Sequence, residues 1–396
     1  MQKDSVVIVQ ALRTPIGAFQ GNLSRISAPE LGAIAMRGVL SFSGIEREDI
    51  TEVMMGCVLT AGLGQAPARQ ATLKAGLGYE VGATTIGKVC GSGMKAVMLA
   101  HDQIVVDPEN VIIAGGMESM SQAPHLLKNM RAGVKFGHDT VIDHMLFDGL
   151  EDAYDKGTPM GSFADDTAAA YKYTREAQDK FAKTSAERAK QAVKDDKFIH
   201  EIIPIILTTP KGEVEINADE TIERALPEKL PKLKPAFNEN GTVTAGNASS
   251  LSDGAAALLL MGESKAREKS LRVRAKIIAH ATHAQAPKKF TTAPVEAIKK
   301  VLQKANWKLE EVDLFEINEA FAVVPMVCLK ELNLDLAKVN VYGGACALGH
   351  PIGASGARIM VTLMSALEKE NKSKGIAVAC IGGGEATAIA IERVNN

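Results

Sequence analysis

Two cysteines that lie far apart in the sequence each occupy a glycine-rich segment. Residues 89–95 read VCGSGMK around Cys90, and residues 379–385 read ACIGGGE around Cys380. Cys90 precedes a predicted helix, whose unpaired N–H groups and dipole favour the thiolate form of a nearby cysteine. Cys380 ends an apolar strand, and the N–H groups of the glycines after it could bind an oxyanion. We therefore expect Cys90 to act as a nucleophile and Cys380 as an acid or base.

A histidine and an asparagine stand in two further turns rich in small residues. His350 precedes a proline and a predicted helix, so its neutral imidazole could take the proton from the Cys90 thiol. Asn318 follows a predicted strand, and its simplest role would be to cap the next helix. The other three cysteines are Cys57, Cys328 and Cys346. The first two lie in apolar runs typical of core positions, and the third could be reactive or structural.

Composition excludes several classes of function. The 396 residues carry a formal net charge of -2, which gives no overall reason to expect a nucleic-acid or membrane partner. No apolar run is long enough for a membrane span, and no signal peptide precedes the first predicted strand, so we expect a cytoplasmic protein. The five cysteines and eight histidines lack zinc-site spacings, so no metal is expected. Nucleotide-binding glycine motifs are also lacking, which disfavours a dinucleotide cofactor.

Apolar segments of helical and strand periodicity alternate in two series, which is typical of an α/β fold with a mainly parallel sheet. The first series predicts strands over 5–9, 53–58, 84–89 and 111–114 and helices over 29–42, 66–76 and 92–105. The second predicts strands over 273–281, 313–317, 339–341 and 376–381 and helices over 294–305, 320–332 and 353–368. Ser27 and Glu30 predict a capping box at the start of the first helix.

Short segments of similar sequence in the two series indicate an internal duplication. Residues 48–50 resemble 310–312, 92–95 resemble 355–358, and 115–118 resemble 382–385, at offsets of 262, 263 and 267. A nearly constant offset is what two related halves would give. We expect one half at 1–120, completed by about 249–271, and another at 272–396. The pattern breaks at 121–248, where we expect an inserted loop domain with a charged helix near 175–195 and polar turns at 208–242. Insertions of this length usually form a lid, a binding surface or an oligomer contact.

Six motifs, taken in order, resemble those of the thiolase family. They are residues 89–95, GGMESMS at 115–121, TVTAGNAS at 242–249, NEAF at 318–321, residues 343–356 and residues 380–384. The resemblance runs from RTPIG at 13–17 to the end of the chain, most closely to the branch that forms acetoacetyl-CoA. It implies two duplicated β/α halves in a layered αβαβα core.

The resemblance also implies a reaction, the reversible Claisen condensation of two acetyl-CoA to acetoacetyl-CoA and CoA. Cys90 would be acylated, and His350 would activate it. His350 and a water held by Asn318 would form one oxyanion hole, and the amides of Cys90 and Gly382 the other. Cys380 would deprotonate the second acetyl-CoA. No metal or redox cofactor is implied, and a loop like residues 120–140 implies a homotetramer.

The CoA site is implied in the same way. Its residues would be Leu150, Met160, Arg224, Leu233, Ala245, Ser249, Phe290, Ala320 and Phe321. Some neighbouring positions depart from the family pattern. Thr158 and Pro159 precede Met160 in place of a histidine, Glu223 stands where an arginine next to the adenine is usual, and Phe290 stands where many members have Met.

Three alternatives share parts of this pattern. A degradative 3-ketoacyl-CoA thiolase for longer chains has the same catalytic groups and differs only in pocket shape. A ketosynthase would lack Cys380 as second base and commonly carries a histidine in place of Asn318. An inactive scaffold is disfavoured because all four catalytic groups are present.

Overall fold

The computed structural model describes residues 4–210, 212–224 and 227–394, so the extreme ends of both predicted halves lie outside it. One ten-stranded sheet forms its centre, in the order β12-β13-β14-β11-β1-β10-β5-β3-β4, with β2 paired to β10. The strands of this sheet are β1 (Val6–Arg13), β2 (Gly17–Ala18), β3 (Glu52–Gly56), β4 (Gly82–Ile86), β5 (Ile112–Ser119), β10 (Ser252–Gly262), β11 (Ala275–Ala284), β12 (Leu314–Ile317), β13 (Lys374–Ile381) and β14 (Glu385–Arg393). The helices are α1 (Ala28–Ser43), α2 (Pro67–Lys74), α3 (Ser92–Val106), α4 (Met160–Tyr171), α5 (Arg175–Lys194), α6 (Glu220–Arg224), α7 (Glu263–Glu268), α8 (Ala293–Ala305), α9 (Val323–Glu331), α10 (Ala345–Leu348) and α11 (Ser355–Lys369).

The parallel and antiparallel strand pairings follow the same order on both sides of the central β1–β11 pair. On one side β1 pairs with β10 and β10 with β5, both antiparallel, and β5 pairs with β3 in parallel. On the other side β11, β14, β13 and β12 repeat this sequence of antiparallel, antiparallel and parallel pairs. Two duplicated halves would give this symmetry.

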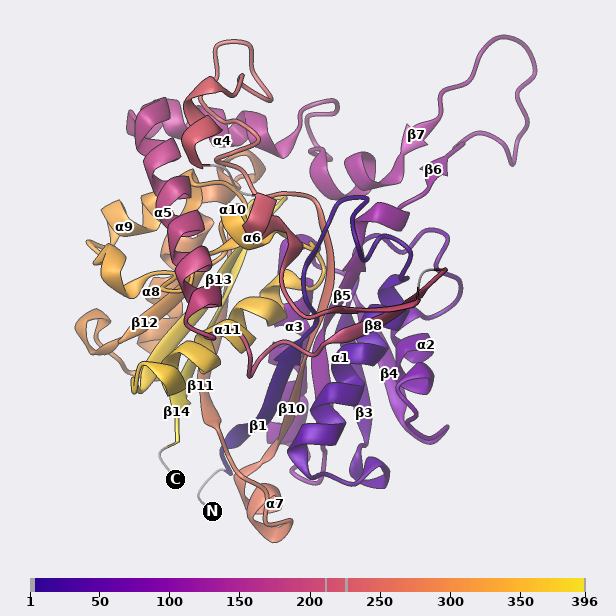
Figure 1. The fold of residues 1–396 in the computed structure, drawn as a ribbon, viewed down its shortest axis with the longest axis vertical. Coiled ribbons are helices and arrows are strands. Elements are labelled where there is room, and N and C mark those ends of the chain that lie inside the picture. The colour runs from indigo at the N-terminus through magenta and orange to yellow at the C-terminus, as the bar shows by residue number, and fades with distance from the viewer. Residues whose placement is uncertain (1–3, 211, 225–226, 395–396) are drawn as a thin grey trace.

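Helices and sheet alternate in layers, as Figure 1 shows. Helices α1 and α2 pack on the outer face of the first half through one buried apolar cluster. Helices α8 and α9 cover the outer face of the second half through another. Between the halves, α3 and α11 pack against each other and both parts of the sheet in a third cluster. The predicted layered α/β core is therefore confirmed. The expectation of a mainly parallel sheet is wrong, because six of the nine strand pairings in the sheet are antiparallel. Strands β10 and β14, which the two predicted series did not include, each run antiparallel to their neighbours.

Most predicted elements of the two halves are present, and the errors fall at their ends. Strand β4 stops at Ile86, so the segment before Cys90 is a loop rather than a strand. The predicted strand at 339–341 forms only one parallel bridge, between Phe315 and Val339. Strand β14 was not predicted. The positive φ angles of Gly383 and Gly384 let the chain reverse sharply and pair β14 back on β13.

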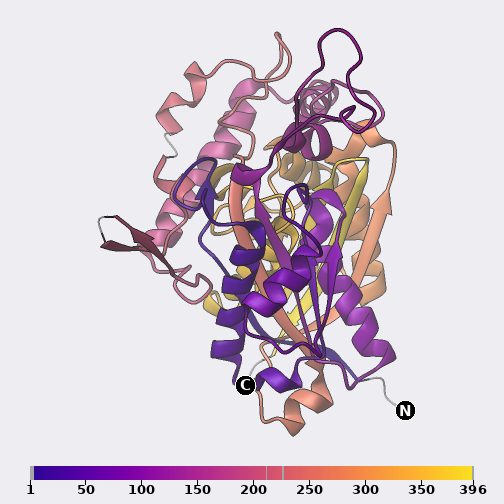
Figure 2. The same cartoon turned by 90° about the vertical axis from the view of Figure 1, so that its right-hand side faces the viewer.

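The segment between β5 and β10 holds more regular structure than expected. Helix α5 was predicted, but α4 and the hairpin of β8 (Ile205–Thr209) and β9 (Gly212–Ile216) were not. A second short ribbon, β6 (His125–Leu126) paired with β7 (Ile142–Asp143), carries a long loop that stands away from the body (Figure 1 and Figure 2). In the described part of the chain, no helix has the length and apolar character that crossing a membrane requires.

Candidate active site

The first turns of α3 and α11 cross in close contact, and this crossing assembles the site. A Cβ atom on Gly356 would lie 2.6 Å from the backbone nitrogen of Met94, and one on Gly93 would lie 3.0 Å from that of Ala357. Only glycine permits so close an approach of two helix backbones. Cys90 lies two residues before α3 and His350 five residues before α11, so the crossing brings their two loops together, with Cys90 and Ile352 in one buried apolar cluster.

Cys90 lies in a 3-10 turn, Val89–Gly91, that runs into α3. Val89 has a φ of 44°, a left-handed conformation that is strained for a β-branched residue and is concentrated at functional sites. The Cys90 side chain is almost buried, and the backbone N–H groups of Cys90 and Gly382 both donate hydrogen bonds to it. These are the two amides predicted to form an oxyanion hole.

The protonation state of Cys90 differs from the sequence-based expectation. Burial raises the pKa of its thiol to about 11, although the two amide hydrogen bonds lower it in part. The expectation that the helix terminus favours the thiolate is therefore wrong for the free protein, because desolvation outweighs the N–H groups. Near neutral pH, Cys90 is a thiol that needs a base.

Cys380 lies near the end of β13 and is completely buried. Burial raises the pKa of its thiol, and a negative charge on the Cys90 sulfur would raise it further, which indicates that the two thiols lie near each other. The turn that carries Cys90 packs on this strand end, since a Cβ on Gly91 would lie 2.4 Å from Ile381 Cδ1. The two cysteines, one from each half of the sheet, thus share one buried site.

His350 is held in one tautomer by its neighbour. The Ser355 hydroxyl donates to the Pro351 carbonyl at 2.9 Å, so its oxygen accepts from His350 Nδ1, 2.5 Å away. The proton therefore resides on Nδ1, and Nε2 keeps its lone pair. Burial, and then the positive charge of Arg358, lower the pKa of His350 to about 3. The imidazole is neutral near pH 7, as a base for Cys90 requires.

Asn318 faces the free nitrogen of this histidine. Its amide Nδ2 lies 3.5 Å from His350 Nε2, and its Oδ1 is buried without a hydrogen-bond partner in the described structure. An unpaired buried acceptor is costly, so it marks a place for a water or a ligand. Asn318 does not cap a helix, because α9 begins only at Val323. Asn340 fixes the strand end before Asn318 by hydrogen bonds to both backbone groups of Ile317.

Sequence reasoning missed Glu118 as a supporting residue, although it stands in a quoted motif. Its buried carboxylate accepts hydrogen bonds from the backbone nitrogens of Val58 at 3.0 Å, Leu59 at 3.1 Å and Gly353 at 2.8 Å. The last of these fixes the loop that follows His350. Burial raises the pKa of Glu118 to about 7, and the three N–H groups oppose this rise.

Glu319 supports the other side of the site in the same manner. Its carboxylate accepts from the Ser185 hydroxyl at 2.7 Å, the Asn340 amide at 2.7 Å and the Cys346 backbone nitrogen at 3.0 Å. The Cys346 thiol points to the backbone carbonyls of Asn247 and Glu319, which favours the structural reading of this cysteine.

The residues expected to contact the acyl group and pantetheine gather in two apolar clusters beside the cysteines. Phe290, Ala320 and Phe321 belong to the cluster that contains Cys380. The rings of Phe290 and Phe321 meet edge to face, 6.3 Å apart between centroids. Leu150 packs against the smaller cluster around Cys90.

Met160 and the rest of the predicted CoA channel lie in the inserted segment and around β10. Met160 Sδ would be 3.3 Å from a Cβ on Gly382. Leu233 packs on Gly246, which follows Ala245 in the sequence. The Ser249 backbone nitrogen donates to the Ala320 carbonyl at 3.0 Å.

Arg224 lies at the end of α6, apart from the apolar clusters around the two thiols. Its side chain is 60% exposed and pairs with Glu220 one turn earlier. An adenine contact by Arg224 stays a prediction.

An ion pair joins the two segments that carry the cysteines. The ammonium of Lys88 pairs with the carboxylate of Glu385, and both side chains are largely shielded from solvent. Lys88 lies two residues before Cys90, and Glu385 begins β14 after the glycine turn. The pair therefore connects the turn that carries Cys90 to the strand end at Cys380.

A separate cavity of about 970 Å³ lies near Phe42, Phe198 and Arg274, and none of the predicted site residues lines it.

Comparisons with known proteins agree with this arrangement. The family of thiolase N-terminal domains matches residues 6–264, and that of thiolase C-terminal domains matches residues 271–393. An acetyl-CoA acetyltransferase of Allochromatium vinosum is 47% identical, over 99% of this chain and 100% of its own length. The crystal structure of the Bacillus anthracis acetyl-CoA acetyltransferase superposes with a TM-score of 0.96 at 40% identity, and covers 99% of both chains. A thiolase from Ascaris suum in complex with coenzyme A superposes with a TM-score of 0.93 at 41% identity, over 98% of this chain and 100% of that one. The chain belongs to the thiolase family.

Proposed function

We propose that this protein is an acetyl-CoA C-acetyltransferase, which condenses two acetyl-CoA to acetoacetyl-CoA and CoA and also catalyses the reverse reaction. The observation that carries the proposal is the pair of buried thiols, Cys90 and Cys380, which are near enough to each other for the charge of one to raise the pKa of the other. A Claisen condensation needs a thioester-forming nucleophile and a separate base for a weakly acidic C–H group. The names of the relatives support the same reaction.

In the first step, the Cys90 sulfur attacks the carbonyl carbon of acetyl-CoA as Nε2 of His350 takes its proton. The bond between that carbon and the CoA sulfur breaks, and CoA leaves with the proton. Negative charge develops on the carbonyl oxygen in the transition state. The N–H groups of Cys90 and Gly382 converge on the Cys90 sulfur and can stabilise that charge without rearrangement.

In the second step, the Cys380 thiol, whose pKa burial raises, passes its proton to the neutral imidazole of His350, and the resulting thiolate removes a proton from the methyl group of another acetyl-CoA. The carbanion attacks the acetyl group on Cys90, the carbon–sulfur bond to Cys90 breaks, and acetoacetyl-CoA forms. The Cys90 thiolate recovers a proton from His350, and both cysteines end as thiols, so the reaction balances with CoA thioesters alone and calls for no redox cofactor. The thioester oxygen of the second acetyl-CoA would lie near His350 Nε2 and a water on Asn318.

The test compares two thiolysis reactions, acetoacetyl-CoA plus CoA and a six-carbon 3-ketoacyl-CoA plus CoA. We expect kcat/KM for the four-carbon substrate to be the higher. A higher value for the six-carbon substrate would replace the proposal with a degradative thiolase, and turnover of neither would remove it.

We also propose that the chain forms a homotetramer through the loop between β6 and β7. Residues 127–141 are exposed throughout, and several of them are apolar, among them Met130, Val134 and Phe136. A projecting apolar loop is typical of a contact surface between chains. Light scattering during size-exclusion chromatography should give four chains for the wild type. If Phe136→Ser leaves a tetramer unchanged, or if the wild type is a dimer, the loop has another role.

A further inference from the structure

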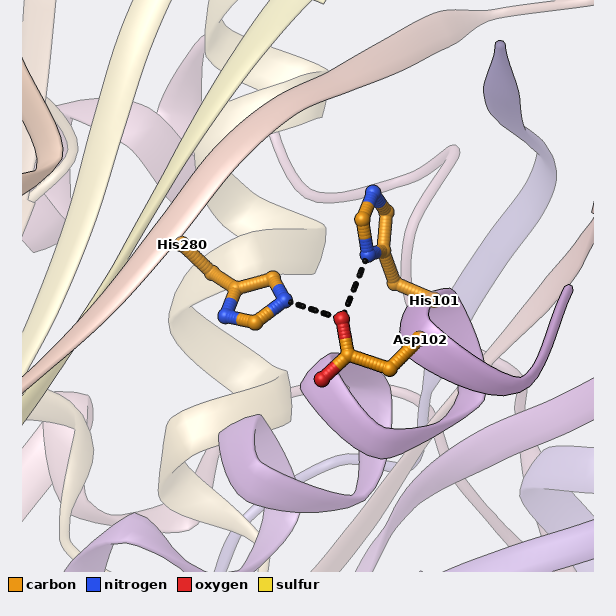
Figure 3. A group of neighbouring side chains, drawn as sticks. All are labelled: His101, Asp102 and His280. Carbon is orange, nitrogen blue, oxygen red and sulfur yellow. Dashed lines mark hydrogen bonds and ion pairs between the residues drawn. The ribbon is translucent and has the colours of Figure 1, made fainter. Parts of the chain in front are cut away.

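Three side chains with metal-binding groups converge at a place that the proposed reaction does not use. His101 and Asp102 lie near the end of α3, and His280 lies on β11, in the other half of the sheet. Figure 3 shows both imidazole rings directed to the same oxygen of the Asp102 carboxylate. His101 Nδ1 is 3.1 Å and His280 Nε2 2.8 Å from that oxygen.

The structure assigns a further site to these residues: we propose that His101, Asp102 and His280 bind a divalent transition-metal ion of the Zn²⁺ type. One ligand atom from each residue lies within 4.8 Å of the other two, and among the described residues no other group of three or more His, Cys, Asp or Glu does so. Ligands around a tetrahedral ion with bonds of about 2.0 Å are about 3.3 Å apart. The nitrogen–oxygen distances are therefore close to those that an ion needs.

The chemistry of the three groups selects the metal. Two imidazoles and one carboxylate suit Zn²⁺, Ni²⁺, Co²⁺ or Cu²⁺, whereas Mg²⁺ and Ca²⁺ prefer sites made only of oxygen. The imidazoles are mostly shielded, with 17% and 14% of their side chains exposed, and the Asp102 side chain is 54% exposed. An ion can thus enter from the solvent side and keep a water as its fourth ligand.

The site joins the two halves of the molecule. Asp102 and His280 are 178 residues apart in the sequence, and helix α3 begins at Ser92, directly after the turn that holds Cys90. A bound ion would fix α3 to β11 and stabilise the fold by linkage, because the unfolded chain cannot present the same three ligands. Lys304, whose ammonium donates to the His280 backbone carbonyl at 3.0 Å, opposes binding by its charge. Lys304→Gln should therefore tighten binding.

The test is a calorimetric titration of the full-length protein with Zn²⁺ after alkylation with iodoacetamide, so that reactive thiols do not bind the metal. We expect one ion per chain. Asp102→Asn is the principal variant because its side chain is half exposed and the change keeps its shape; it should weaken binding roughly tenfold or more, as should His280→Asn. His283→Asn, on the same strand but outside the group, is the matched control and should bind as the wild type does.

Two further readouts separate this site from the catalytic thiols. Zn²⁺ should raise the melting temperature of the alkylated wild type and of His283→Asn, but not of Asp102→Asn. Co²⁺ should give visible d–d bands without sulfur-to-cobalt charge transfer. Absence of binding after alkylation, equal affinity in Asp102→Asn, or a sulfur charge-transfer band would each overturn the proposal.

Discussion

Replacing Gly356 with alanine should separate the two catalytic loops while leaving the chain folded. The new Cβ would lie 2.6 Å from the Met94 backbone nitrogen, about 0.8 Å inside the 3.4 Å at which ordinary contact begins. Because backbone atoms at a helix start cannot swing aside, α11 must move relative to α3. Overpacking of this kind costs about 1–3 kcal/mol in unfolding free energy. The higher helix propensity of alanine returns up to about 1 kcal/mol.

Activity should suffer far more than stability. A misplacement of about 1 Å between reacting groups can lower the rate about 100-fold. We therefore expect kcat/KM for acetoacetyl-CoA thiolysis to fall by one to two orders of magnitude, while urea denaturation shows a loss of about 0–2 kcal/mol.

Gly87 provides the matched control for this change. It lies three residues before Cys90, has nothing within 4 Å of a Cβ, and does not have a positive φ. Gly87→Ala should be nearly silent in both assays. If Gly356→Ala keeps wild-type activity, or if Gly87→Ala loses as much, then the helix crossing does not position the site.

Three further predictions test other parts of the site. Since burial raises the pKa of Cys90 to about 11, its alkylation by iodoacetamide should accelerate about tenfold per pH unit between pH 6 and 9; a plateau below pH 8 would indicate a resting thiolate instead. Glu118→Gln should lower the unfolding free energy by about 1–3 kcal/mol. Both oxygens of the Glu118 carboxylate accept hydrogen bonds from backbone N–H groups, so in either orientation of the glutamine amide its NH₂ group would face another N–H donor. Unchanged stability in denaturant would show that Glu118 does not hold the loops. Phe290→Met, chosen because alanine would leave a cavity at this buried position, should raise the six-carbon to four-carbon ratio of kcat/KM; an unaltered ratio would exclude Phe290 from setting chain length.

The layout of the two halves could be predicted because their signals are local. A short apolar run, a glycine turn and a helical period identify a strand, a loop and a helix without knowledge of the rest of the chain. Cys90 and His350 were found in this way, each in a loop before a helix. Strand β14 was missed because the glycines and Glu385 were read as a functional motif rather than as a reversal into a paired strand.

What the sequence could not reveal depends on burial and on long-range contacts. Burial raises the pKa of Cys90, and part of the opposing effect comes from the Gly382 amide in the other half of the fold. The position of Cys90 before a helix therefore predicted the wrong protonation state. The role of Glu118 could not be predicted because the loop whose backbone N–H group it binds, at Gly353, lies far away in the sequence. His101, Asp102 and His280 have no common spacing in the sequence, which is why no metal was expected from it.

The central claim is that Cys90 carries the acyl group and Cys380 moves the proton. Mass spectrometry of proteolytic peptides after mixing with acetyl-CoA tests it most directly, on the wild type and on Cys380→Ser, together with deuterium exchange at the acetyl-CoA methyl group. We predict an acetyl adduct on Cys90 in both proteins and methyl exchange in the wild type alone. An adduct on Cys346 or Cys380, or exchange retained in Cys380→Ser, would contradict this division of roles.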